Sequence, residues 1–584
     1  MENKTWTPEP EPVIGPAEVR AAAELLKKYR QGKANLEKRV IENEQWFKMR
    51  HWAQFRKNSR DGDPEPASAW LFNSIANKHA DAMDNYPEPN VLPREESDRK
   101  AAQMLGAILP VILERNQFER TYSDIWWKKL KSGTGIYGVF WNPDRESGLG
   151  DIDIRPVDML NIFWEPGIRD LQDSRDLFTV ELRDNALLEE EYPQLRGTLH
   201  TSALEMGQYL YDDSVDTSEK SAVVDWYYKR NGLLHYCKFV NDTVLFASEN
   251  NPLLRESGWY DHGQYPFVAD TLFPDEGTPA GFGYVDVMKD CQMYIDKLNQ
   301  AMLRHAMMAS RKRYFIRDNG SVNEKEFADW NRDFIHVSGS GLGEDSIREV
   351  NIGAIDSLIP NLLSQKIEEI KETSGNRDFS QGSTSGGVTA ASAIAALQEA
   401  GSKLSRDMIK GSYRAFAQLN YLCIELIRQF YTEPRCFRIV GTDGEEYFSV
   451  DNRTLRPQSQ GSAFGLDLGN RLPVFDIRVT SQKASPFSKA AQNELAKELY
   501  SLGFFRPDMG EQALAALEMM DFEGKEMVKK SVSKNLQLQE QLSKMQEQLT
   551  QMAKLLTSGS AAPAMEEPAS AQEQTEPTEP EAAS

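Results

Sequence analysis

Apolar positions recur with helical spacing in two stretches that flank a short mixed segment. In residues 281–310 they fall three and four apart, at Tyr284, Met288, Cys291, Ile295, Leu298 and Met302. Residues 351–373 have similar spacing, with Ile355, Leu358, Ile359, Leu362, Leu363, Ile367 and Ile370. Because residues three and four apart share one face of a helix, both stretches are predicted to be amphipathic helices.

Residues 311–350, between these helices, have a different pattern. RKRYFI (311–316) and FIHV (334–337) are short strand candidates, and SGSGLG (338–343) is typical of a loop. One or two helical turns are predicted over residues 323–333. We therefore expect a small strand-bearing insert at this point.

The second helix leads into a Gly/Ser-rich loop, SGNRDFSQGSTSGGV (374–388), and then a proline-free stretch, 389–431. At ~1.5 Å per residue, a helix over 389–431 would be about 65 Å long, which indicates a large, elongated body. A glycine-rich turn before a helix can cradle phosphate, because free backbone N–H groups attract anions. The Lys-Ser/Thr ending of a nucleotide loop is missing here and near Gly133, so an NTPase is not predicted.

The apolar period shortens to two after Gly135, which predicts strands over Ile136–Phe140 and Ile152–Val157. Asp151 and Asp153 alternate with isoleucine, so strand periodicity places both on the solvent side. Together with Asp158 they also resemble the carboxylates of a metal-dependent nuclease. No Glu, His or Lys follows at a recognisable catalytic offset, so we expect no metal site. Residues 223–246, with Asn-Gly and Asn-Asp turns, are typical of a β-meander.

Two clusters in the N-terminal helical region invite a functional interpretation. The aromatic and basic run Trp126, Trp127, Lys128, Lys129 and Lys131 has the elements of a base-stacking platform. We prefer a buried stripe of Ile125, Trp126 and Leu130 with the lysines on the exposed face. His79 lies on a mixed helix face, where an ordinary polar contact is expected.

The long helix carries four basic residues at three- and four-residue spacing: Lys403, Arg406, Lys410 and Arg414. They share one face, which suits phosphate groups or, alternatively, ion pairs within the chain or with a neighbouring subunit. The opposite stripe is narrow and small enough for close helix packing, and it comprises Ile394, Leu397, Leu404, Met408 and Ala415 with Gly401 and Gly411.

Strands are predicted again after residue 431, at CFRIVG (436–441), EEYFSV (445–450) and LPVFDIRVT (472–480), so the fold class is α+β. Helices follow over 485–521. Three heptads then repeat in 4,3 spacing, at Leu538, Leu542, Met545, Leu549, Met552 and Leu556, as in a short coiled coil. The last segment, 558–584, is rich in Ala, Pro, Glu and Ser and is predicted to be disordered.

Composition narrows the function classes. The net charge of −22 argues against a protein that grips nucleic acid tightly, although it permits loose contact with DNA. The four cysteines are scattered without paired spacing, which argues against a zinc site or a disulfide scaffold. No secretory leader and no apolar run of ~18 residues is found, so secretion and membrane insertion are not expected.

The order of these elements, helix, mixed insert, helix, loop and very long helix, resembles the central layout of the portal proteins of tailed bacteriophages. Three segments also resemble the family in their amino-acid sequence. They are SGTGIYGVFWNP (132–143) with DIRPVDMLNIFWEP (153–166), PAGFGYVDVMKDCQMYIDKLNQ (279–300) and GVTAASAIAALQEAGSKLSRD (387–407). They occur in the family's order and, as an ordered set, cover most of 73–431.

The resemblance implies a ring-forming portal fold. Its expected parts are a flexible N-terminus (1–15), a wing (16–280), a first stem helix (281–310), a clip (311–353), a second stem helix (354–373), a channel loop (374–388), a long wing helix (389–431), wing strands that rejoin the wing sheet (432–484), crown helices with a short coiled coil (485–557) and a disordered acidic tail (558–584).

The same resemblance implies which residues meet DNA. The channel loop would face the duplex through Asn376, Arg377, Gln381, Ser383 and Thr384. The basic residues at the end of the first stem helix would lie near the docking surface of the packaging motor or near the channel wall, and they are Arg304, Arg311, Lys312 and Arg313. The basic face of the long helix is a second candidate.

The function implied is a structural channel for double-stranded DNA packaging and ejection, with no catalytic residues and no cofactor. In the family, usually twelve subunits form a ring at one vertex of the virion capsid, after assembly in the host cytoplasm. Expected partners are the terminase large subunit, the head–tail adaptor, and the major capsid and scaffolding proteins. Two alternatives remain: a ring-forming adaptor that does not pass DNA, and a nuclease or NTPase of the packaging machinery.

Overall fold

The structure is a computed structural model, and it describes residues 13–55, 63–199, 219–310, 314–316, 323–329, 336, 347–349, 353–375, 403–441, 444–450, 452–459, 462–463, 466–467, 470–483, 498, 500–503, 510–519 and 525–558. The chain divides into two compact units, Met1–Lys483 and Ala484–Ser584.

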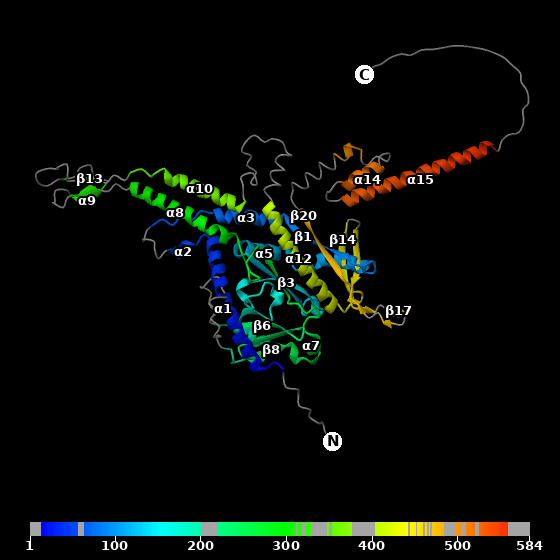
Figure 1. The fold of residues 1–584 in the computed structure, drawn as a ribbon, viewed down its shortest axis with the longest axis horizontal. Coiled ribbons are helices and arrows are strands. Elements are labelled where there is room, and N and C mark those ends of the chain that lie inside the picture. Colours follow the sequence, from blue (N-terminus) through cyan, green and yellow to red (C-terminus); the bar gives the residue numbers. More distant parts are fainter. Residues whose placement is uncertain are drawn as a thin grey trace, which may run out of the picture. The chain divides into compact units, whose positions relative to one another are not determined.

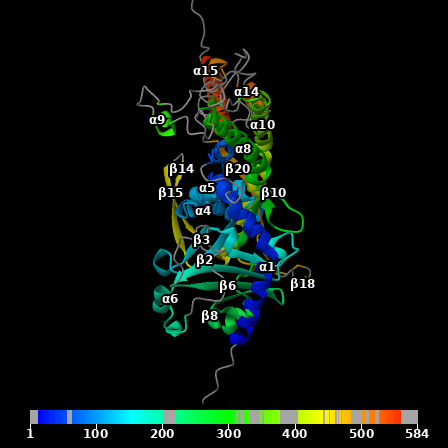
Figure 2. The same cartoon turned by 90° about the vertical axis from the view of Figure 1, so that its left-hand side faces the viewer.

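A five-stranded antiparallel sheet is covered on one face by the long helix α1 (Pro16–Phe47). Its strands follow the chain in the order β4 (Ile162–Trp164), β5 (Asp176–Asp184), β6 (Lys220–Arg230), β7 (Leu233–Val240) and β8 (Thr243–Ala247). Figure 2 shows α1 crossing this sheet, and buried side chains such as Leu26 and Phe178 form the core between them. The β6–β7 turn is Asn231-Gly232, both with positive φ, so the predicted meander is confirmed.

A three-stranded antiparallel sheet, in the order β3-β2-β9, organises the larger core. It contains β2 (Thr134–Asn142), β3 (Asp151–Val157) and β9 (Phe267–Thr271). Helices α3 (Trp70–Met83), α4 (Arg99–Arg115), α5 (Phe118–Ser132) and α12 (Lys403–Phe430) contribute to the same core. Ile125, Trp126 and Leu130 are buried, as predicted.

The two amphipathic helices predicted around the mixed insert are present as α8 (Tyr284–Ser310) and α10 (Leu358–Ser374), and they run side by side (Figure 1). The thiol of Cys291 on α8 contacts the carbonyl oxygen of Lys366 on α10 at 3.3 Å. Helix α10 begins seven residues later than predicted, and Pro360 lies in its first turn, where its missing N–H costs nothing.

In the insert, β12 (Tyr314–Ile316) pairs antiparallel with β13 (Ile347–Glu349), and α9 (Glu324–Ala328) matches the predicted helical turns. The partner of β12 is a segment that was not predicted as a strand; of the predicted strand FIHV (334–337), only His336 lies within the described part. The loop 338–343 also lies outside it.

The strands predicted after residue 431 are present, and in the described part of the chain they lie in two-stranded sheets. β14 (Arg435–Gly441) pairs with β15 (Gly444–Val450), and β20 (Phe475–Lys483) pairs antiparallel with β1 (Asn85–Pro93). The segment YPEPNVLP, predicted to turn the chain out of α3, is most of β1. Its three prolines lie at positions 87, 89 and 93, always an even number of residues apart, so the intervening residues of the other parity keep their N–H groups for the β20 side.

Shorter elements complete the first unit. They are α2 (Trp52–Phe55), α6 (Asn185–Glu191), α7 (Pro252–Ser257), β10 (Phe273–Pro274), β11 (Gly281–Phe282), β16 (Gln458–Ser459), β17 (Ser462–Ala463), β18 (Leu466–Asp467) and β19 (Asn470–Arg471).

The second unit contains α14 (Gly510–Met519) and α15 (Lys525–Ser558). Ala513, Leu517 and Val532 form its buried core. Beyond this contact the predicted heptad stripe is exposed, with Leu542, Leu549 and Met552 each more than 60% accessible.

Candidate functional site

Three of the four basic residues predicted to share one face of α12 lie at the protein surface. Arg406, Lys410 and Arg414 are exposed, while Met408 and Ala415 on the opposite stripe are buried. The side chains of Lys403 and Leu404 lie outside the described residues, as do Ile394, Leu397, Gly401 and Glu399. A row of cations on one exposed helix face can meet phosphate groups, and that role remains a prediction.

Two polar clusters, each of one Ser, one Lys and one Asp, attach the buried face of α12 to neighbouring elements, and we call them clasps. In the first clasp, Ser405 Oγ donates to Asp81 Oδ2 at 2.9 Å and accepts from Lys78 Nζ at 3.0 Å. In the second clasp, Ser412 Oγ donates to Asp270 Oδ2 at 2.5 Å and accepts from Lys129 Nζ at 2.6 Å. Burial lowers the pKa of both lysines, whereas the facing carboxylates favour their charged forms.

The second clasp overturns one prediction. The lysines of the aromatic and basic run were expected on the exposed face, but Lys129 is fully buried, with its Nζ 2.6 Å from Asp270 Oδ1. The reason is that α5 is covered on this side by α12 and β9, which the pattern of α5 alone cannot show. Lys128 and Lys131 are partly buried and pair with Asp158 and Glu44.

The Asp151–Asp153 prediction is also wrong in part. Asp151 is buried, and it accepts a hydrogen bond from the Tyr431 hydroxyl at 2.6 Å. Asp153 is partly exposed and pairs with Arg145 at 2.5 Å. These carboxylates serve structural contacts, and across the described ranges no three His, Cys, Asp or Glu side chains are grouped to hold a metal ion.

Arg304, a predicted channel residue, lies where α8 meets an extended strap, residues 63–68. It forms an ion pair with Asp63, with Nε 3.1 Å from Oδ1. Ser68 is bound most closely: its N–H donates to Asp296, its carbonyl accepts from Gln292, and its hydroxyl accepts from Asn299. Arg311, Lys312, Arg313, Asn376, Arg377, Gln381, Ser383 and Thr384 lie outside the described residues.

Helices α8 and α10 expose large apolar side chains. On α8 these are Val287, Tyr294, Leu303, Met307 and Met308, and on α10 they are Leu358 and Leu362. The predicted stripe of α8 is buried at Tyr284, Met288 and Ile295, but Leu298 and Met302 are only half-buried. Apolar surface gathered on one helix pair is typical of an interaction site.

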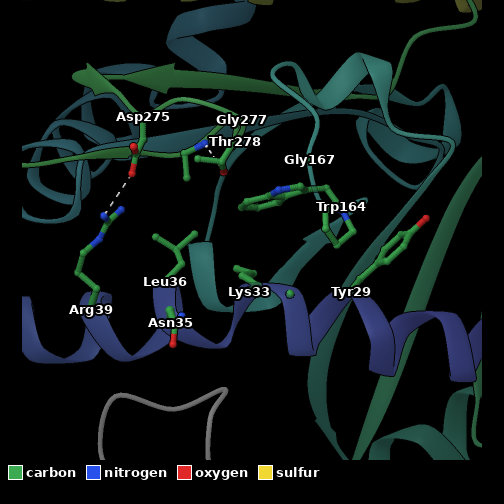
Figure 3. Close-up of a pocket in the computed structure, with 13 residues that line it drawn as sticks. Tyr29, Lys33, Asn35, Leu36, Arg39, Trp164, Gly167, Asp275, Gly277 and Thr278 are labelled. Atoms are coloured by element: carbon green, nitrogen blue, oxygen red, sulfur yellow. Dashed lines mark hydrogen bonds and ion pairs between the residues drawn. The ribbon is translucent and has the colours of Figure 1, made fainter.

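A pocket lies between α1, the turn after β4, and the β10–β11 hairpin, with a volume of about 350 Å³ (Figure 3). Trp164, Leu36 and Ala280 supply apolar lining, and Gly32 is required because a Cβ there would lie 2.7 Å from Pro166. Arg39 spans the rim, donating to the Gly281 carbonyl at 2.7 Å and facing Asp275 at 3.7 Å.

The buried base of this pocket is occupied by Lys33. Its ammonium group donates to the backbone carbonyls of Met159 and Ile162, 2.7 Å for the latter, and it lies 4.0 Å from Glu37. Burial lowers the pKa of Lys33 to about 8. Lys33 and Arg39 are both bound within the chain, and they fix α1 against β4 and the β10–β11 hairpin.

Sequence reasoning missed Lys33, Ser405, Ser412 and the strap. Lys33 is one of many charged residues in α1, so the sequence does not show that it is buried. Ser405 and Ser412 lie among the basic residues of α12, and nothing in the local pattern distinguishes them. His79 was interpreted correctly: its Nε2 lies 3.0 Å from Ser123 Oγ and its ring stacks on Trp127. Within the described part of the chain, no helix is long and apolar enough to cross a bilayer.

Two comparisons with known proteins relate this chain to phage portal proteins. A family model described as phage P22-like portal protein matches residues 80–264 and 234–584. A portal protein of Helicobacter pylori bacteriophage KHP30 is 21% identical over 411 residues, or 66% of this chain. The matched part covers 63% of that relative, so the chain spans less than two thirds of its length.

Proposed function

The chain belongs to the phage P22-like portal protein family, and from this premise we propose that it assembles into a ring through which double-stranded DNA passes. The ring has about twelve subunits and occupies one vertex of the virion capsid. It is a structural component of DNA packaging and ejection, and its work is to provide a channel and docking surfaces, with no catalytic step.

The observation that carries the ring is the set of large apolar side chains exposed along the α8–α10 pair. A helix pair in water normally turns such side chains inward, and several of them exposed together are typical of an interaction site. Leu303 and Met307 on α8, with Leu362 on α10, are more than a third exposed. Packing against the same helices of neighbouring subunits would cover them, as in a cyclic assembly.

In this assignment, residues 16–280 and 432–484 form the wing, 281–310 and 354–373 the stem helices, and 311–353 the clip. The loop 374–388 faces the DNA through Asn376, Arg377, Gln381, Ser383 and Thr384. Arg311, Lys312 and Arg313 lie where stem and clip meet. Arg304 supports the stem through its ion pair with Asp63 and is the least suited of the four to hold a phosphate.

The charge balance supports a channel that does not hold DNA. The net charge of −22 repels the duplex, and the exposed cations of α12 offer few phosphate contacts. Loose contact lets DNA slide. The clip would dock the terminase large subunit and later the head–tail adaptor, while the capsid and scaffolding proteins contact the outer surface.

The proposal is tested by electron microscopy of the purified full chain. We expect end-on views with about twelvefold symmetry and a central hole wider than the ~20 Å DNA duplex. A monomer or dimer, also in the presence of scaffolding protein, contradicts the ring. A closed ring whose hole is too narrow for DNA would favour the adaptor function instead.

A further inference from the structure

The two clasps that hold α12 differ in their exposure to water. In the second clasp both charged side chains, Lys129 and Asp270, are fully buried. In the first clasp Asp81 is half-exposed, and the Lys78 ammonium lies 3.9 Å from its carboxylate. Water screens the first pair and leaves the second unscreened, so the second clasp is the firmer attachment.

Gly411 lies between Ser405 and Ser412, in the interior of α12. The nearest atom to a Cβ added there would be the flexible guanidinium end of Arg414, at 3.9 Å. Packing therefore does not require glycine, in contrast to Gly32 on α1. Glycine weakens a helix interior relative to alanine, because its backbone has more freedom to lose.

The two parts of α12 also bury different amounts of apolar surface. After Ser412, the buried side chains Phe416, Leu419, Leu422, Leu426 and Ile427 are at most 1% exposed. Before Gly411, the only buried apolar side chains among those described are Met408 and Ile409, at 5% and 7%. The part of α12 before Gly411 is therefore held by less apolar packing than the part after it.

We propose that Gly411 is a hinge at which residues 403–410 open away from the body, controlled by the Ser405 clasp, while residues 412–430 stay anchored by the Ser412 clasp. Opening would move Arg406 and Lys410 relative to Arg414 and so divide the basic face. The effect on a DNA channel rests on the proposed function, whereas the hinge itself does not.

Hydrogen exchange of the purified full chain, followed by mass spectrometry, tests the hinge. Amides of 406–411 should exchange faster than those of 416–427. Gly411→Ala should slow exchange in 406–411 by about fivefold, because alanine favours the helix. Ser405→Ala should speed it by a similar factor, and both variants should leave 416–427 unchanged.

Matched variants separate the hinge from general helix stability. Gly106→Ala lies in α4 with no atom within 4 Å of the added Cβ, so it should leave 406–411 unchanged. Ser412→Ala should raise exchange in both parts of α12. Uniform exchange along α12, or no effect of Gly411→Ala on 406–411, overturns the hinge. Hydrogen exchange is measured on the amides of each subunit, so the hinge can be tested even if the chain forms no ring. In that case only the proposed effect of the hinge on a DNA channel would be lost.

Discussion

Tyr431, directly after α12, donates a hydrogen bond to Asp151 at the start of β3, with 2.6 Å between the hydroxyl oxygen and Oδ1. Both side chains are buried, and the guanidinium of Arg435 lies 4.0 Å from the Tyr431 ring centre. This contact joins residues 280 positions apart and ties the end of α12 to the three-stranded sheet.

Tyr431→Phe should therefore destabilise the first unit by about 1–3 kcal/mol, because the buried Asp151 carboxylate loses a donor. Chemical denaturation followed by circular dichroism measures the loss. Tyr294→Phe, on α8 and 51% exposed, should change the free energy of unfolding by less than about 0.5 kcal/mol. Equal effects of the two variants would show that the Asp151 bond contributes nothing.

Lys33 gives a prediction for the pH dependence of stability. Burial lowers its pKa from 10.5 to about 8 in the folded chain. Between these values the unfolded chain binds more protons, so the free energy of unfolding contributed by this group rises with pH, by up to about 3 kcal/mol. Lys33→Met should flatten the rise between about pH 8 and 9.5, as measured by denaturation at each pH.

The control for this prediction is Lys27→Met, on the same helix, because Lys27 is half-exposed and pairs with the exposed Glu24. Its variant should keep the pH dependence of the native chain. A Lys33→Met protein with the native slope would show that the buried ammonium does not titrate in this range.

The exposed face of α8 predicts a variant that folds but does not assemble. Leu303→Gln combined with Met307→Gln keeps good helix formers and removes apolar surface, so the melting temperature of the isolated subunit should hardly change. Light scattering after size-exclusion chromatography should show the loss of large assemblies. Leu253→Gln on α7, where the side chain is 79% exposed, should assemble normally. Full assembly of the double variant would place the subunit contact elsewhere.

The heptad stripe of α15 predicts self-association that does not depend on salt. The positions flanking the stripe are glutamines, at 539, 541, 546 and 548, so no ion pairs cross the seam. Leu542→Lys with Leu549→Lys should abolish contact between these helices, as measured by cross-linking of cysteines introduced nearby. The native contact should persist between ~0.05 M and ~0.5 M salt.

Glu547→Gln, on the side of α15 away from the stripe, serves as the control and should cross-link like the native chain. Strong salt dependence in the native protein would point to charged groups, and therefore to a different contacting face.

Local periodicity predicted the elements but not the extent of their packing. The stripe of α8 has the same spacing throughout, yet Ile295 is buried and Met302 is only half-buried, because the body of the protein ends between them. Sequence spacing reports which residues share a face, and it does not report how far the neighbouring elements reach. That is also why the exposed end of the helix pair was not foreseen.

The polar residues were harder to predict than the apolar ones. Asp151 and Lys129 were expected at the surface because charged side chains usually lie there, and their partners Tyr431 and Asp270 are 280 and 141 residues away. No local pattern records such a pairing. The family resemblance, in contrast, drew on the order of several segments and was confirmed.

The pairing of β1 with β20 limits when the first unit can finish folding during its synthesis. Residues 85–93 must wait for residues 475–483 before either strand has its neighbour. At about 5–20 residues per second, a ribosome needs roughly 20–80 s to supply the second strand, and until then β1 offers an open edge to other chains. The helical parts can fold during synthesis, but the body of the subunit closes only once translation has nearly reached the C-terminal unit.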